Sequence, residues 1–156
     1  MAQILTIESA IHEIKKIPDP IILAGGCFDV LHPGHISFLS HAKKIGGALV
    51  VFVESDEKIK SMKGEKRPIH TQKDRVYILS HLTIIDYVIP LPFFSTNKEY
   101  EDLVYALKPT FFAVTKDDPV IQYIRPQAEK INASVVEVTE RIDAHASSQI
   151  IKELNI

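Results

Sequence analysis

Short, wholly apolar runs alternate along this chain of 156 residues with longer segments of helical periodicity. The clearest runs are ALVVFV and FFAV, and the full set predicts strands at 21–27, 48–53, 86–91, 111–114 and 134–138. Strands without polar alternation are buried on both faces, and strict alternation with helices implies right-handed crossovers between parallel strands. The pattern therefore predicts a doubly wound, parallel, five-stranded sheet within a three-layer α/β/α sandwich.

The segments between these runs predict the helices of a Rossmann-like fold at 7–17, 33–45, 72–82, 95–107, 120–131 and 147–154. Residues 54–70 are rich in charge, are interrupted by Gly64 and Pro68, and predict a long mobile loop with room for a short helix. Loops of that length inside compact domains tend to be functional. We expect a single domain over 1–156, in which 1–19 form an N-terminal helical extension.

Composition limits the kinds of partner to be expected. The net charge is −2 with both signs interspersed, whereas nucleic-acid binding requires many Lys and Arg side chains against phosphates. No 18 apolar residues run together, and the one cysteine, Cys27, excludes an intramolecular disulfide and suits a reducing compartment. We therefore expect a cytoplasmic protein with a small-molecule ligand and with neither a nucleic-acid nor a membrane partner.

The segment 25–35, GGCFDVLHPGH, joins the first predicted strand to the second predicted helix. Proline is favoured at the first position of a helix, so Pro33 places His32 near the N-cap and His35 in the first turn. Glycines allow a ligand to approach the main chain, and the unpaired N–H groups at a helix start attract anions. This segment is therefore predicted to bind a nucleotide phosphate.

The two histidines allow other interpretations. They could be two partly exposed side chains at a helix start, or a pair of zinc ligands. Zinc requires a third and a fourth ligand nearby, and one cysteine with scattered histidines offers little. We therefore predict no metal site in the protein and favour a phosphate-binding role for His32 and His35.

Polar residues follow three of the predicted strands, and the carboxyl ends of parallel strands meet at one edge of the sheet. These residues are Asp29, His32 and His35 after the first strand, Lys116, Asp117 and Asp118 after the fourth, and Arg141, Ser147 and Ser148 after the fifth. We expect the three groups to converge on one ligand.

The run 26–35 resembles the G-x-F-D-x-x-H-x-G-H signature of the cytidylyltransferase-like nucleotidyltransferases. Further matches follow in the family's order: Glu54-Ser55-Asp56, Lys63-Gly64, Arg67-Pro68-Ile69, Arg75 and Val88-Ile89-Pro90. The Lys-Gly, Arg-Pro and later Arg arrangement most resembles the heptose-phosphate enzymes, and the glycerol-phosphate enzymes are also similar.

The resemblance implies transfer of CMP or AMP from CTP or ATP to a sugar or polyol phosphate, with release of pyrophosphate. It also implies a homodimer, and phosphate chemistry implies Mg²⁺. His32, His35 and Lys63 would be catalytic, with Lys63 in the mobile loop closing over the phosphates. The implied nucleotide-binding residues are Gly26, Cys27, Phe28, Asp29, Gly34, Arg141, Ser147 and Ser148, and the implied substrate-binding residues are Asp56, Arg75, Lys116 and Asp117.

The end of the chain departs from the family pattern R-T-x-G-I-S-T-T-x-I-I. In the segment 141–151, Ala144 stands in place of the glycine and Ala146 in place of the first serine. A non-catalytic nucleotide-binding or regulatory module of the same fold is therefore an alternative function. A dinucleotide-dependent oxidoreductase is a weaker alternative, because no G-x-G-x-x-G follows the first strand.

Overall fold

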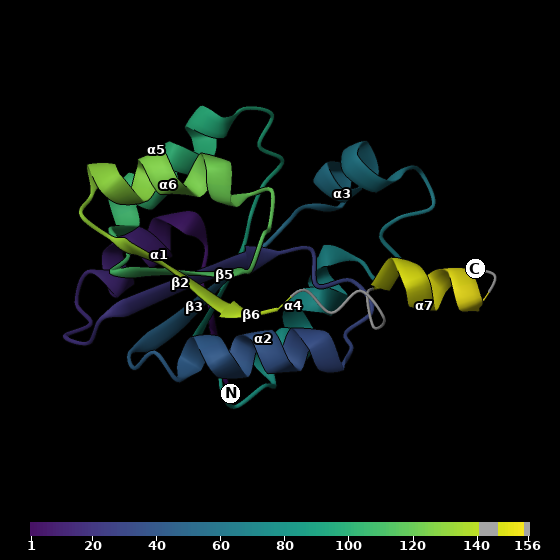
Figure 1. Cartoon of the computed structure of the whole chain (residues 1–156), viewed down its shortest axis with the longest axis horizontal. Helices are drawn as coiled ribbons and strands as arrows, with labels where there is room; N and C mark the ends of the chain where they lie inside the picture. The colour runs from purple at the N-terminus through teal and green to yellow at the C-terminus, as the bar shows by residue number, and fades with distance from the viewer. Residues whose placement is uncertain (141–146, 155–156) are drawn as a thin grey trace.

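The computed structural model describes residues 1–140 and 147–154. The described residues form a six-stranded parallel sheet in the order β1-β4-β3-β2-β5-β6 (Figure 1). The strands are β1 (Gln3–Ile4), β2 (Ile21–Gly26), β3 (Ala48–Val53), β4 (Tyr87–Pro90), β5 (Phe111–Thr115) and β6 (Ser134–Thr139). The parallel, doubly wound architecture predicted from the sequence is confirmed.

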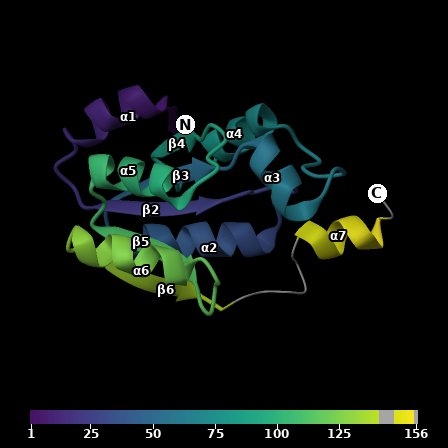
Figure 2. The same ribbon diagram turned by 90° about the horizontal axis from the view of Figure 1, so that it is seen from above.

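Helices cover both faces of the sheet, which gives the three layers visible in Figures 1 and 2. One face packs against α1 (Ile7–Ile14), α5 (Asn97–Leu107) and α6 (Ile121–Lys130), and the other against α2 (Pro33–Lys43) and α4 (Gln72–Ser80). Alternate residues of β2 point to opposite faces: Leu23 belongs to the first core cluster and Ile22 to the second. Burial on both faces explains why this strand is wholly apolar.

The sheet has six strands, not the five predicted. The additional strand is β1, where Gln3 pairs with Tyr87 and Ile4 pairs with Val88 at the edge next to β4. This strand is two residues long and both of its side chains are exposed, so it leaves no apolar run in the sequence. The segment 1–19 therefore contains an edge strand that completes the sheet and the helix α1, and is not a helical extension alone.

The segment 54–70, predicted as a long loop, contains a two-turn helix, α3 (Asp56–Lys63). Ser55 caps this helix by accepting a hydrogen bond from the N–H of Lys58, and Gly64 ends it with a φ of +98°. Figure 2 shows α3 and α7 (Ser147–Glu153) beyond the carboxyl edge of the sheet. In the part of the chain that the structure describes, no helix is long and apolar enough to cross a membrane.

Candidate active site

The strand order reverses between β2 and β5, and ligands of doubly wound sheets bind over the carboxyl ends of the strands at that point. A cavity of about 680 Å³ lies there. Its walls come from the loop after β2, the ends of β3 and β5, and the helices α3, α5 and α6. Its polar side chains include His32, His35, Glu54, Lys58, Lys63, Asn97, Tyr100, Asp118 and Gln127. This cavity is the candidate active site.

His32 and His35 cap the start of α2. Nδ1 of His32 accepts a hydrogen bond from the N–H of Gly34 at 3.1 Å, and Nδ1 of His35 accepts one from the N–H of His32 at 3.4 Å. The ring centroids lie 3.8 Å apart. Because Nδ1 is the acceptor, each neutral ring carries its proton on Nε2. The helix start therefore offers two Nε2–H donors beside its backbone N–H groups, which suits phosphate oxygens.

The charge state of the site follows from the surroundings of His35. Burial, with the nearby His32 and Lys63, lowers the pKa of His35 from 6.5 to about 4. His35 is therefore neutral at physiological pH and donates a hydrogen bond without carrying charge. Lys63 lines the cavity and is the last residue of α3, a short helix of the kind for which the predicted 54–70 loop left room.

The backbone between β2 and α2 has an unusual conformation. Phe28 and Val30 both adopt a φ of +50°, which is uncommon for residues other than glycine. The Phe28 ring is buried and lies below Gly26, where an added Cβ would be 3.2 Å from a ring carbon. Glycine at position 26 therefore leaves room for the ring and for a ligand near the main chain. Burial raises the pKa of the Cys27 thiol, which also lines the cavity.

Asp29 holds the segment after α3 against the loop that joins β2 to α2. Its carboxylate accepts hydrogen bonds from Arg67 Nε at 2.9 Å and from the N–H groups of Ile69 and His70 at 2.8 and 3.0 Å. Burial opposes ionisation of Asp29, but the three donors outweigh it and hold its pKa below the usual range. Asp29 is 1% exposed and Arg67 is 7% exposed. These contacts favour a role for Asp29 in organising the loop, and the nucleotide-binding role that the resemblance implies stays a prediction.

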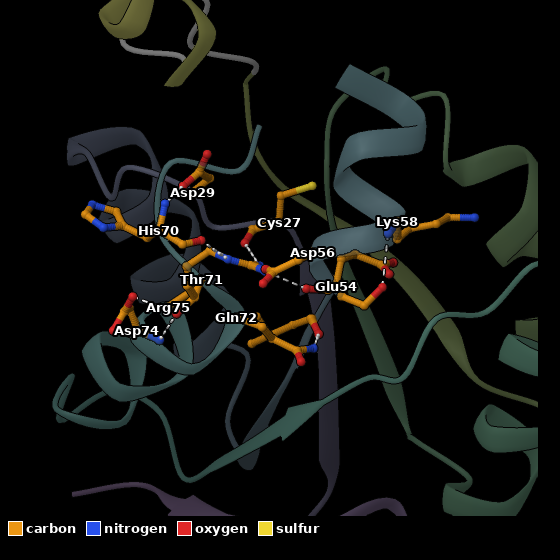
Figure 3. A network of polar contacts seen from close by, with 12 residues as sticks. Cys27, Asp29, Glu54, Asp56, Lys58, His70, Thr71, Gln72, Asp74 and Arg75 are labelled. Atoms are coloured by element: carbon orange, nitrogen blue, oxygen red, sulfur yellow. Dashed lines mark hydrogen bonds and ion pairs between the residues drawn. The ribbon is translucent and has the colours of Figure 1, made fainter. Parts of the chain in front are cut away.

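Arg75 is a buried residue of α4 and is not among the described residues that line the cavity. Its guanidinium donates to the carbonyl oxygens of Cys27 at 2.6 Å, Glu54 at 2.9 Å and His70 at 3.1 Å, and to the Asp56 carboxylate at 2.7 Å (Figure 3). These contacts favour a positioning role for Arg75 and Asp56, and the substrate-binding roles that the resemblance implies stay predictions. The pair ties the loops after β2 and β3 to α4.

The predicted substrate residues after β5 lie on the surface. Nζ of Lys116 is 3.2 Å from a carboxylate oxygen of Glu140, and Asp117 is exposed with a φ of +57°. Among the described residues, neither Lys116 nor Asp117 lines the cavity, whereas Asp118 does. A left-handed residue at position 117 turns the chain, and the turn directs the following residue to the site.

The structure describes only some of the residues near the end of the chain that were predicted to bind the nucleotide. Arg141 lies outside the described residues, and Ser147 begins α7. Oγ of Ser148 accepts a hydrogen bond from Arg67 at 3.3 Å. Through Arg67, the last helix is connected to Asp29 and to the loop after β2.

Several cavity residues were missed by sequence reasoning. Glu54 immediately follows β3, so its position at the carboxyl edge could have been used as a signal. Lys58, Asn97, Tyr100 and Gln127 lie on helices, where nothing local in the sequence separates a cavity residue from an ordinary helical one. Among the described residues, no group of three or more His, Cys, Asp or Glu is placed to hold a metal ion.

Comparisons with known proteins place the chain in a family. A family model described as cytidylyltransferase-like matches residues 23–154. The bifunctional protein HldE of Desulfatibacillum aliphaticivorans is 34% identical over 151 residues, which are 95% of this chain and 29% of that protein. HldE of Helicobacter pylori is 41% identical over 107 residues, which are 69% of this chain and 22% of that protein. The chain thus spans less than a third of the length of these relatives.

Solved structures agree with this assignment. The lipopolysaccharide core biosynthesis protein from Thermoplasma volcanium is 27% identical, with a TM-score of 0.64 over 79% of this chain and 97% of that one. A pantoate-beta-alanine ligase from Francisella tularensis, 15% identical, shares the fold alone, with a TM-score of 0.69. The chain belongs to the cytidylyltransferase-like family. Its HldE relatives support the predicted relation to heptose-phosphate nucleotidyltransferases.

Proposed function

We propose that this chain transfers a nucleotidyl group from ATP or CTP to a small sugar or polyol phosphate and releases pyrophosphate. The observation that carries the proposal is the pair of capping histidines at the start of α2, below the point where the strand order reverses. Backbone N–H groups and two Nε2–H donors there would hold the α- and β-phosphates of the nucleotide.

The reaction needs no covalent intermediate on the protein. An oxygen of the acceptor phosphate forms a bond to the α-phosphorus as the bond to the bridging oxygen breaks, and the electron pair leaves with pyrophosphate. Negative charge on the transferred group and the leaving group would be stabilised by His32, His35 and Lys63, all of which line the cavity. The buried contacts of Asp29 and Arg75 keep the loops around them in that arrangement.

Mg²⁺ would enter with the nucleotide. The described residues provide no cluster of His, Cys, Asp and Glu for a resident metal ion, and Asp29 is already bonded to Arg67. Mg²⁺ commonly binds through substrate phosphates and retains several waters. The homodimer and the cytoplasmic location stay predictions from the sequence.

The proposal is tested by measuring pyrophosphate release with ATP and with CTP against a panel of sugar and polyol phosphates. The key variant is His35→Asn, because the Asn oxygen can replace Nδ1 as the cap acceptor while the Nε2–H donor is lost. Loss of one such donor lowers kcat by about 100- to 1,000-fold. His41→Asn is the matched control, since His41 is an exposed residue of the same helix.

The alternative of a non-catalytic binding module predicts a different result. It rests on Ala144 and Ala146, which lie outside the described residues. A binder would take up ATP or CTP in calorimetry but release no pyrophosphate with any acceptor. In that case His35→Asn would weaken nucleotide affinity alone, and the proposed transfer reaction would be wrong.

A further inference from the structure

The side of the cavity between β3 and α5 contains an acidic residue that the proposed phosphate chemistry does not use. Glu54 follows β3, and its carboxylate lines the cavity. Its two oxygens accept from the hydroxyl of Tyr100, on α5, at 3.0 and 2.9 Å. The neighbouring Arg75 donates to the main-chain oxygen of Glu54, so its charge is bonded elsewhere than to this carboxylate.

A carboxylate has about four acceptor positions, and a single phenol hydroxyl cannot fill them all. Burial raises the pKa of Glu54 despite the hydrogen bond from Tyr100, which reflects how little water solvates the group. A half-buried carboxylate at the cavity wall can therefore take further donors from whatever occupies the cavity. It also repels phosphate, so the donors must come from another part of the ligand.

Tyr100 is itself held firmly. Its ring makes an edge-to-face contact with Phe94, with centroids 4.9 Å apart, and the ammonium group of Lys58 lies 5.5 Å from its ring centroid. Nζ of Lys58 also donates to the carbonyl oxygen of Phe94 at 3.3 Å. These contacts fix the direction of the Tyr100 hydroxyl and, through it, the orientation of the Glu54 carboxylate.

We propose that Glu54, oriented by Tyr100, is the specificity-determining residue for the acceptor and accepts hydrogen bonds from the hydroxyl groups of a polyhydroxylated phosphate. This inference rests on the proposed function. Sugars and polyols supply adjacent hydroxyl donors, and the apolar side chain of Phe52 on the same cavity wall suits their C–H faces. Phosphocholine has neither O–H nor N–H donors and would leave the carboxylate without a hydrogen bond, which is a basis for rejection. The ammonium group of phosphoethanolamine would donate to Glu54 in place of hydroxyl groups, so this acceptor separates recognition of hydroxyls from recognition of a cation.

The position of Glu54 in the sheet favours the acceptor over the ribose of the nucleotide. Strand β3 lies on one side of β2 and β5 on the other, and the phosphate-binding loop follows β2 between them. A nucleotide bound at the reversal point lies between β2 and β5. The β3 side is then left for the second substrate.

The test compares acceptors and variants in the pyrophosphate assay at saturating ATP or CTP. The probes are heptose 1-phosphate, glucose 1-phosphate and glycerol 3-phosphate against phosphoethanolamine and phosphocholine. We expect turnover with a hydroxylated acceptor, and a loss of about 10- to 100-fold in its kcat/KM in Glu54→Gln through a higher acceptor KM. The nucleotide KM should be unchanged. Tyr100→Phe should also raise the acceptor KM and leave the nucleotide KM unchanged, with a smaller loss in kcat/KM. Glu57→Gln, an exposed control on α3, should match the parent protein in both KM values.

Each other outcome has a definite meaning. A raised nucleotide KM with an unchanged acceptor KM in Glu54→Gln would overturn the inference and assign the residue to the ribose. Preference of the parent protein for phosphoethanolamine or phosphocholine would also overturn it, while leaving nucleotidyl transfer in place. No pyrophosphate from the parent protein with any acceptor would overturn the proposed function and this inference with it. Matching melting temperatures for parent and Glu54→Gln exclude misfolding as the cause.

Discussion

The loops after β2 and β3 are held by buried charges, whereas Lys116 after β5 and Glu140 after β6 carry their charges on the surface. Asp29 and Arg75 are each 1% exposed and form hydrogen bonds to several elements. Lys116 and Glu140 form one ion pair, with side chains 49% and 77% exposed. The two regions meet at the same cavity but are fixed to very different degrees.

This difference separates two functions within the site. Donors that stabilise charge in a transition state must be fixed in advance, because reorganisation during the reaction would reduce their effect. Recognition of one small molecule instead of another tolerates, and often uses, loops that vary. The rigid β2 and β3 side fits phosphate chemistry and the proposed selection of the acceptor by Glu54, whereas the β5 side, with its exposed charges, fits contacts that tolerate movement.

The largest expected effect is from Asp29→Asn. The change leaves the buried Arg67 without its carboxylate, and removal of one partner from a buried ion pair lowers the free energy of unfolding by about 3–5 kcal/mol. Urea denaturation at neutral pH measures it. Asp117→Asn, on the exposed side, is the control and should stay near the parent value; equal losses in the two variants would contradict the contrast between the regions.

Arg75→Lys should have the next largest effect. Lysine keeps the charge but lacks the planar fork that reaches three carbonyl oxygens and the Asp56 carboxylate. We expect a loss of about 2–3 kcal/mol in the free energy of unfolding, because buried acceptors lose their donors. Thermal denaturation with and without ATP measures the loss. If stability is unchanged but the acceptor KM rises, the arginine binds the acceptor directly, as the sequence resemblance implied.

A pH effect should be seen on the phosphate side. The pKa of His35 is about 4 in the folded protein, against 6.5 for an ordinary histidine, so the unfolded chain binds the extra proton first as the pH falls. The contribution of His35 is complete above pH 6.5 and is lost as the pH falls towards 4. After allowance for solvent screening, we expect about 1–2 kcal/mol. Unfolding midpoints at pH 7 and pH 5 measure it; His35→Asn should lessen the loss and His41→Asn should not.

Local patterns in the sequence predicted some elements of this structure and missed others. Apolar runs predicted five of the six strands, most clearly β2 and β3, since burial on both faces leaves a local pattern. The two-residue strand β1 left none, because its backbone pairing to β4 does not depend on its exposed side chains. The loop 25–35 was predicted from contiguous residues, and the structure confirms the strand, loop and helix start that surround it.

Contacts between residues far apart in the sequence could not be predicted from local sequence patterns. Arg75 is a cation within α4 and Lys116 one that directly follows β5. Nothing in the sequence shows that the first is buried and bonded to the carbonyl oxygen of Cys27 while the second pairs with Glu140 on the surface. Tyr100 falls at an apolar position of a predicted helix. Its hydroxyl contacts Glu54, which is 46 residues away in the sequence. Such side chains acquire their roles from the topology, which brings α5 to the end of β3.

The smallest expected effect is from Lys116→Ala. Exposed ion pairs contribute about 0–1 kcal/mol, so the free energy of unfolding should stay within about 0.5 kcal/mol of the parent value. Because Lys116 lies outside the cavity walls in the described structure, kcat/KM for ATP, CTP and the acceptors should also be unchanged. A large rise in the KM of one substrate would show that the loop after β5 moves Lys116 onto that substrate. The loop after β5 would then take part in binding by closing over that substrate. The two regions would differ in mobility and not in function.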